Sequence, residues 1–409
     1  MARKAKRDLT MEEQLARGPL DLPFLMLVLL LLGIGLVMLF SASYYTAYRD
    51  STPAVNHNPY YYIVHQAAYA AAGVAAMYVV SRINYQHFRW MAPLVLGVSI
   101  VLLIICYIPG LNAPINGQRR WLKLLLVAGP TYQPSEIAKV AVVLFFAARL
   151  CKRDTEHKKR FTKRTGLGRL LNFLEGIGFL ELVPYGIVLV VVLGLVAFER
   201  HVSGALLVAV GAAAVLLVSG ISLWWFTFLG GAGVGLVGIM YATTGYVRKK
   251  FALWLDPWSA DPRVEGFQFR QGMYSIASGG LLGRGLGESG QKYGFVPEPE
   301  NDMIFSIVVE ELGLVGAYLI LLLFALLILR GYWIALHARD KFGMLVVVGI
   351  ITLLAAQTFF NIGVVTGLIP NTGISLPFFS YGGTALMIQL AEMGMILSIS
   401  RQIPAPRKD

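Results

Sequence analysis

Long apolar runs separated by short polar segments recur along the whole chain. Ten runs approach the roughly 20 residues that a helix needs to cross about 30 Å of hydrocarbon. They lack the alternation of apolar and polar residues that lipid-facing barrel strands show, so we predict that all of them are helices. The predicted spans are 21–43, 60–81, 90–109, 133–150, 178–198, 203–220, 223–245, 303–329, 343–366 and 383–400.

Composition supports this pattern and defines the fold class. The chain has 409 residues, of which 56% are hydrophobic, and no polar block of domain size interrupts the apolar runs. We therefore expect an all-α polytopic integral membrane protein with one membrane domain over 1–409. The net charge of +12 is expected to reflect loops beside anionic lipid, and no nucleic-acid partner is expected.

The distribution of lysine and arginine predicts the orientation. The N-terminal tail 1–20, the loop 151–170 and the C-terminal tail 401–409 are basic and fall on one side, which is cytoplasmic by the positive-inside rule. Two further basic segments, 111–132 and the long loop 245–302 between spans seven and eight, then lie on the outer face. We infer that their cations meet an anionic partner there. The aromatic residues of the long loop favour an ordered structure.

Acidic residues flank and interrupt the eighth span, within the stretch VPEPENDMIFSIVVEELGLVG (296–316). Asp302 lies where the membrane helix should begin. A carboxylate at a membrane boundary costs several kcal/mol unless it faces protein or a wet cavity, and it is retained mostly where function needs it. Asp302 is therefore the first site candidate.

A second cluster combines NGQRRW (116–121) with QPSEIAK (133–139). Gln133, Pro134 and Ser135 are typical of a helix start. Glu136 and Lys139 are three residues apart on one helical face, so they are expected either to form a structural ion pair or to contact substrate. The adjacent arginines on the outer side favour phosphate binding.

Three other motifs are expected to form turns or irregular backbone. SGGLLGRGLGESG (278–290) lacks the strand and the lysine of a phosphate-binding loop, so a tightly turning backbone is expected. Residues 199–201 are expected to form a short, solvated outer turn, and His201 alone gives no case for a metal site. Residues 361–383, rich in glycine, proline and asparagine, predict broken or re-entrant backbone that lines protein or a cavity.

These blocks together resemble the SEDS family (shape, elongation, division and sporulation), which includes RodA, FtsW and SpoVE. The resemblance rests on NGQRRW, QPSEIAK, the stretch 256–287, the acidic stretch 296–316 and the stretch 361–383, in this order. It implies ten membrane helices, both termini in the cytoplasm of a bacterial cell and polymerisation of lipid II into glycan strands. The chain departs from many members at Phe267, Asn301, Met303 and the turn ERHVSG (199–204).

The resemblance also implies roles for individual residues. Asp302 matches the aspartate that the family needs for polymerisation, and we expect it to act as general base on an acceptor hydroxyl. The expected substrate-binding residues are Arg119, Arg120, Trp121, Lys123, Glu136, Lys139, Arg270, Gln271 and Glu298.

The expected partners are lipid II, the membrane and a class B penicillin-binding protein with transpeptidase activity. A divalent cation, Mg or Mn, is expected to help neutralise the leaving pyrophosphate, although no metal ligands are assigned. Two alternatives are a flippase that carries lipid II across the bilayer and a non-catalytic scaffold of a cell-wall synthase. The sequence does not separate elongation, division and sporulation members.

Overall fold

The computed structural model describes residues 19–108, 110–115, 118–123, 131–153, 172, 179–199, 201–258 and 266–403. A helix overlaps most of each of the ten predicted ranges, with ends that differ by a few residues. These helices are α2 (Leu22–Arg49), α3 (Tyr61–Arg82), α4 (Gln86–Ile105), α5 (Pro134–Arg153), α7 (Phe179–Phe198), α8 (Val202–Val218), α9 (Leu223–Thr243), α12 (Ile304–Leu336), α13 (Lys341–Val365) and α14 (Gly383–Ser400). The tail 1–18 and most of the basic loop, 154–171, lie outside the described residues.

Within the described residues, six helices are long and apolar enough to cross a membrane, namely α2, α3, α4, α12, α13 and α14. Shorter apolar helices cover Leu182–Phe198 and Val202–Val218. The protein is thus a mostly helical, multi-pass membrane protein.

Two of the segments between the apolar helices hold structure that the span pattern did not specify. The described parts of segment 111–132 form a small antiparallel sheet of order β1-β2-β3, built from β1 (Asn112–Ile115), β2 (Gln118–Lys123) and β3 (Thr131–Tyr132). The prediction of an all-α fold therefore needs this one correction, because short hairpin strands outside the helices carry little sequence signal. The described parts of the loop 245–302 contain α10 (Gly245–Leu255) and α11 (Phe267–Gly279).

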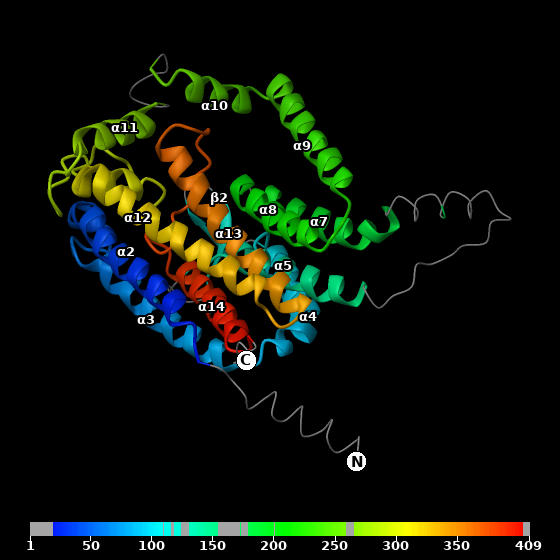
Figure 1. Ribbon diagram of the computed structural model, residues 1–409. Helices are drawn as coiled ribbons and strands as arrows, with labels where there is room; N and C mark the ends of the chain where they lie inside the picture. Colours follow the sequence, from blue (N-terminus) through cyan, green and yellow to red (C-terminus); the bar gives the residue numbers. More distant parts are fainter. Residues whose placement is uncertain are drawn as a thin grey trace.

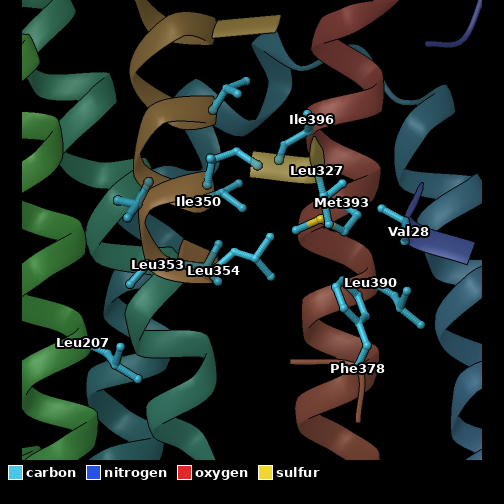
Figure 2. Close-up of a cluster of buried hydrophobic side chains, with 14 of the residues drawn as sticks. Val28, Leu207, Leu327, Ile350, Leu353, Leu354, Phe378, Leu390, Met393 and Ile396 are labelled. Carbon is cyan, nitrogen blue, oxygen red and sulfur yellow. The ribbon is translucent and has the colours of Figure 1, made fainter. Parts of the chain in front are cut away.

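The helices surround a central core in which α12, α13 and α14 lie side by side (Figure 1). The helix α14 packs on α3, and α13 packs on α8. Figure 2 shows side chains from these elements meeting in one buried cluster, among them Val28, Leu207, Leu327, Ile350, Leu354, Phe378, Leu390 and Met393. In contrast, α9 and α10 lie at the periphery (Figure 1), and the main contacts of α9 are with α8 and α10.

Helix caps connect neighbouring helices at the end of the bundle near the C-terminus. Asp21 accepts a hydrogen bond from the backbone N–H of Phe24 at 3.0 Å and so caps α2. Its carboxylate also pairs with Arg330 of α12 at 2.7 Å. Asp340 caps α13 and accepts from Tyr85 and Gln86 beside α4. These contacts join α2 to α12 and α4 to α13 at the end of the bundle that lies far from Asp302.

The helix α12 is broken at Gly313, whose φ of 68° and ψ of −174° are not helical. The glycine-rich loop that follows α11 satisfies the backbone groups that the break releases. Arg284 and Gly285 donate their N–H groups to the carbonyls of Glu310 and Glu311, each at 3.0 Å. Leu314 donates to the carbonyl of Gly280, also at 3.0 Å. The loop is therefore a tight turn against a helix backbone, as expected from its glycines, rather than a phosphate cradle.

Two buried carboxylates attach the same region to its neighbours. Glu310 accepts hydrogen bonds from Ser275 of α11 at 2.8 Å and from Ser289 at 2.6 Å. Glu311 pairs with Lys292 at 3.0 Å and accepts from Ser41 of α2 at 2.6 Å. Because each carboxylate meets several donors, the cost of burying it is largely offset. This network holds α2 and α11 against the first half of α12.

Substitution of Gly283 tests whether the loop supports the break in α12. Gly283 has φ of +79°, and a Cβ there would overlap the carbonyl oxygen of Glu311. Gly283→Ala is therefore expected to lower the free energy of unfolding by about 2 to 3 kcal/mol. The control is Gly287→Ala, at φ of +84° with no described atom within 4 Å of the added Cβ, which is expected to cost about 1 kcal/mol. Unfolding in detergent measures both, and equal losses would contradict the account.

Candidate functional site

Asp302 lies in the turn that directly precedes α12, and its side chain is partly exposed. The backbone carbonyl of this residue accepts a hydrogen bond from Asn361 Nδ2 of α13 at 2.8 Å. The same Asn361 nitrogen donates to the carbonyl of Ile374, also at 2.8 Å. One buried asparagine thereby fixes the aspartate turn to α13 and to the segment that follows it.

The broken segment between α13 and α14 packs on the aspartate turn. Tyr381 donates its N–H to the carbonyl of Glu300 at 2.8 Å, and Ser380 Oγ donates to the carbonyl of Asn301 at 2.7 Å. Gly373 faces Asp302, since a Cβ there would lie 3.9 Å from Oδ2. The predicted irregular backbone thus lines protein, and it forms one side of the site around Asp302.

Gln268 of α11 contacts the Asp302 side chain from another direction. Its Nε2 donates to Oδ1 at 3.1 Å. The residue of this helix that the sequence predicts at the site is Gln271, three positions further along, for which the structure gives no comparable bond to Asp302 among the described residues. The sequence predicted a residue of α11 at the site. The rotation of α11 relative to α12 decides which of its glutamines reaches the Asp302 carboxylate.

Burial and, to a lesser extent, the nearby negative charge of Glu298 raise the pKa of Asp302 to about 6. Hydrogen bonds from Gln268 and from backbone groups act in the opposite direction. Glu298 itself is exposed and has φ of +46°. Burial also raises the pKa of Glu300 to about 7, with Glu298 and Asp302 adding to the effect. A carboxyl group with a pKa near neutral can both take up and release a proton at physiological pH.

Arg120 of β2 brings positive charge to this acidic turn. It interacts electrostatically with Glu199 and with Glu298. Its guanidinium lies 4.8 Å from the ring centre of Trp121, and burial lowers its pKa. The side chains of the other two predicted cations of this sheet, Arg119 and Lys123, lie outside the described residues.

Arg270 makes contacts that stabilise the outer segment. It is buried, donates from Nε to the carbonyl of Pro257 at 2.6 Å and lies 5.4 Å from the ring centre of Trp258. These contacts join the end of α10 to α11. A direct contact of Arg270 with substrate stays a prediction.

Glu136 and Lys139 form the ion pair that their spacing allows, with Nζ 2.7 Å from Oε2. Both side chains lie in the first turns of α5, and Lys139 is only 4% exposed. Lys139 also interacts electrostatically with Glu392 of α14, a buried residue that the sequence reasoning did not single out. The predicted ion pair between Glu136 and Lys139 is observed, and contact of these residues with substrate stays a prediction.

The prediction of a solvated turn at residues 199–201 is wrong for both described members, Glu199 and His201, which are buried. His201 Nδ1 lies 3.2 Å from Gln133 Nε2 and 3.3 Å from Ser135 Oγ. Burial lowers the pKa of His201 to about 3 and raises the pKa of Glu199 to about 8. Only this short turn separates α7 from α8, so its side chains lie at helix ends against the sheet and α5. The short length of this turn is the sequence signal from which its burial could have been predicted.

Within the described part of the chain, no three His, Cys, Asp or Glu side chains gather as a metal site. The described side chains instead form a group of electrostatically linked charges, several of them buried. Glu298 interacts with both Asp302 and Arg120. Arg120 also interacts with Glu199 and His201, and His201 interacts with Lys139 of the Glu136–Lys139 pair. Such a group can abstract a proton at Asp302 and neutralise an anionic group at Arg120.

Comparison with known proteins finds consistent relatives over nearly the whole chain. The family model described as cell cycle protein (FtsW, RodA, SpoVE) matches residues 22–404. Stage V sporulation protein E of Bacillus subtilis is 39% identical, with 93% of this chain and 97% of that protein covered. A probable peptidoglycan glycosyltransferase FtsW of Geobacter metallireducens is 35% identical, with 94% and 95% covered.

Solved structures agree with these relatives. The fold is similar to a chain described under "Structural coordination of polymerization and crosslinking by a peptidoglycan synthase complex", with a TM-score of 0.72, 26% identity and coverage of 96% and 99%. It is also similar to the rod shape determining protein RodA of Thermus thermophilus, with a TM-score of 0.62, 25% identity and coverage of 94% and 98%. The resemblance inferred from the sequence blocks is confirmed.

The buried ion pair can be tested by comparing its two halves. Lys139 compensates both Glu136 and Glu392, so Lys139→Met leaves two carboxylates without their cation and is expected to cost about 3 to 5 kcal/mol of stability. Glu136→Gln leaves Lys139 facing Glu392 and is expected to cost about 1 to 2 kcal/mol. Denaturant or thermal unfolding in detergent measures the difference. Equal losses would show that Lys139 does not serve both acids.

Proposed function

This chain belongs to the FtsW, RodA and SpoVE family of cell cycle proteins, and we propose that it is a peptidoglycan glycosyltransferase that polymerises lipid II with Asp302 as general base. The observation that carries the proposal is the placement of the Asp302 carboxyl group, which lies in the turn before α12 and is held by Gln268. Burial raises its pKa to about 6, which suits proton transfer near neutral pH. Relatives of similar length are named for this activity.

The chemistry is transfer of a glycosyl group from a polyprenyl pyrophosphate. An acceptor hydroxyl attacks the anomeric carbon, and the bond from that carbon to the pyrophosphate breaks. A hydroxyl is a poor nucleophile, so a carboxylate that takes its proton in the transition state accelerates attack by roughly 10² to 10⁴. Asp302 supplies that carboxylate.

The leaving pyrophosphate gains negative charge, which the cations near Asp302 are suited to stabilise. Arg120 has the position for this role, because it faces the acidic turn through Glu298. Arg119 and Lys123 belong to the same strand and complete the proposed anion-binding group. Trp121, Glu136, Lys139, Gln271 and Glu298 complete the proposed lining.

The same proposal assigns the membrane topology. All ten apolar helices cross the bacterial cytoplasmic membrane, both termini are cytoplasmic, and the sheet, α10, α11 and Asp302 lie on the outer face. Helices over all ten predicted ranges support this arrangement, as does the basic character of the tails and of the loop 151–170. It gives Asp302 access to lipid II in the outer leaflet.

Partners follow from the same reasoning. The similar solved structure is a complex in which polymerisation and crosslinking are coordinated. We therefore propose that this chain works with a class B penicillin-binding protein whose transpeptidase crosslinks the strands that it makes. A flippase is less consistent with the geometry, since transport sites lie near the membrane midplane and Asp302 precedes α12. A scaffold would not need Asp302.

The general-base role is tested with purified protein and labelled lipid II. Asp302→Asn is expected to lower glycan-strand formation by about 10² to 10⁴, with unchanged thermal unfolding, because the amide keeps the shape but cannot take the proton. The matched control is Asp50→Asn, the same change in an exposed cap at the same end of the bundle, which is expected to keep the wild-type rate. A folded Asp302→Asn protein with wild-type activity would overturn the assignment.

Metal dependence gives an independent check. The described residues offer no preformed metal cage, so we propose that any Mg or Mn requirement arises through the pyrophosphate of the substrate, as is usual for Mg²⁺. Chelation with EDTA is expected to lower the polymerisation rate and leave thermal unfolding unchanged, and added Mg or Mn is expected to restore the rate. A rate that chelation leaves unaltered would exclude a role for the cation, and a lowered unfolding temperature would indicate a protein-bound metal.

A further inference from the structure

Gln268 is the side chain of α11 that reaches the Asp302 carboxylate. Its Nε2 lies 3.1 Å from Oδ1. An ionised carboxylate can only accept hydrogen bonds, so the amide nitrogen, and not the amide oxygen, has to face it. Donation to the charged form favours that form, whereas burial among other acidic groups favours the protonated form.

The position of Gln268 is fixed by close packing of α11 on α12. Ser275 donates from Oγ to the carbonyl of Ser306 at 3.0 Å and to Glu310 Oε2 at 2.8 Å. Gly279 allows direct backbone contact, since a Cβ there would overlap the carbonyl oxygen of Val309. A donor on a rigidly packed helix loses little entropy when it forms its bond, so it can hold the carboxylate in one orientation.

The bond to Gln268 distinguishes the two carboxylate oxygens. Oδ1 is the acceptor for the amide, and Oδ2 faces Gly373, with 3.9 Å to the position of a Cβ there. Gly373 has φ of +66°, a conformation that favours glycine and leaves no side chain over Oδ2. Position 373 therefore places no side chain against Oδ2, whereas Gln268 occupies Oδ1.

We propose that Gln268 is a positioning residue for Asp302: it holds Oδ1, keeps the carboxylate ionised and directs Oδ2 to the acceptor hydroxyl. This inference rests on the proposed polymerase function. In the reaction, the hydroxyl proton passes to Oδ2 while the acceptor oxygen bonds to the anomeric carbon. The bond from that carbon to the pyrophosphate breaks, and its electron pair leaves with the pyrophosphate.

The other groups around Asp302 act in both directions. Glu298 of the same turn disfavours ionisation of Asp302, and the backbone groups of Asp302 and Met303 hydrogen-bond the carboxylate and favour it. Negative charge on Asp302 in turn raises the pKa of Glu300. Arg120 interacts with Glu298. Among the described residues, α13 and the segment after it contribute neutral groups, Asn361 and Gly373. Gln268 is thus the side-chain donor to the carboxylate that the structure describes.

The test is the pH dependence of glycan-strand formation by the purified full chain. A base has to be deprotonated to act, so the wild-type rate is expected to fall as the pH falls through about 6. Removal of the donor raises the pKa of Asp302, so in Gln268→Ala this acidic limb moves up by about one to two pH units. At pH values above this shifted limb, Gln268→Ala is expected to regain most of the wild-type rate.

Two further variants test whether the effect depends on the hydrogen-bond donor of Gln268 or on the volume of its side chain. Gln268→Glu keeps the size of the side chain but replaces the donor with a second carboxylate, so its limb is expected to move further than that of Gln268→Ala. Ser278→Ala on the same helix removes a hydroxyl that bonds within α11, to the carbonyl of Ser275, and is expected to keep the wild-type profile. Thermal unfolding of every variant is measured alongside.

The outcomes distinguish this inference from the polymerase assignment. A rate that drops equally at all pH values in Gln268→Ala, or a Gln268→Glu variant with the wild-type profile, would overturn the positioning role while Asp302 remains the base. If Asp302→Asn is fully active, the general-base proposal fails first, whatever Gln268 does.

Discussion

A helix broken inside a membrane protein has to find new partners for its released backbone groups, because hydrocarbon supplies none. In this chain the break is at Gly313 of α12, and the loop that follows α11 provides the partners through Arg284, Gly285 and Gly280. This interaction determines how closely α11 approaches α12. The position of Gln268, and therefore the environment of Asp302, depends on it.

Four acidic groups around the first half of α12 fall into two kinds, which differ in their surroundings. Glu310 and Glu311 each meet several hydroxyl, backbone or lysine donors, so their burial holds elements together. Asp302 and Glu300 lie in one acidic turn, and burial and mutual repulsion raise their pKa values toward neutral. Groups of the first kind are suited to structure, and those of the second kind to proton transfer.

The cationic strand β2 supplies what the acidic turn lacks. Arg120 interacts electrostatically with Glu298 and Glu199 and with His201, and His201 contacts Gln133 and Ser135. Segments that are far apart in the sequence, 118–123 and 298–302, are brought to one end of the bundle. A substrate with a sugar and a pyrophosphate needs both kinds of group close together.

The sequence by itself determined the helices, because apolar runs of membrane length leave few other ways to satisfy the backbone, and its ordered blocks indicated the family and Asp302. The pair of Glu136 and Lys139 also followed from spacing on one helix. What only the tertiary structure decided was contact between segments. Helix rotation placed Gln268 rather than Gln271 on Asp302, and the packing of α5 and the sheet buried Glu199 and His201. Local sequence patterns determine which side chains share one face of a helix. Which other segment packs on that face depends on contacts between residues far apart in the sequence.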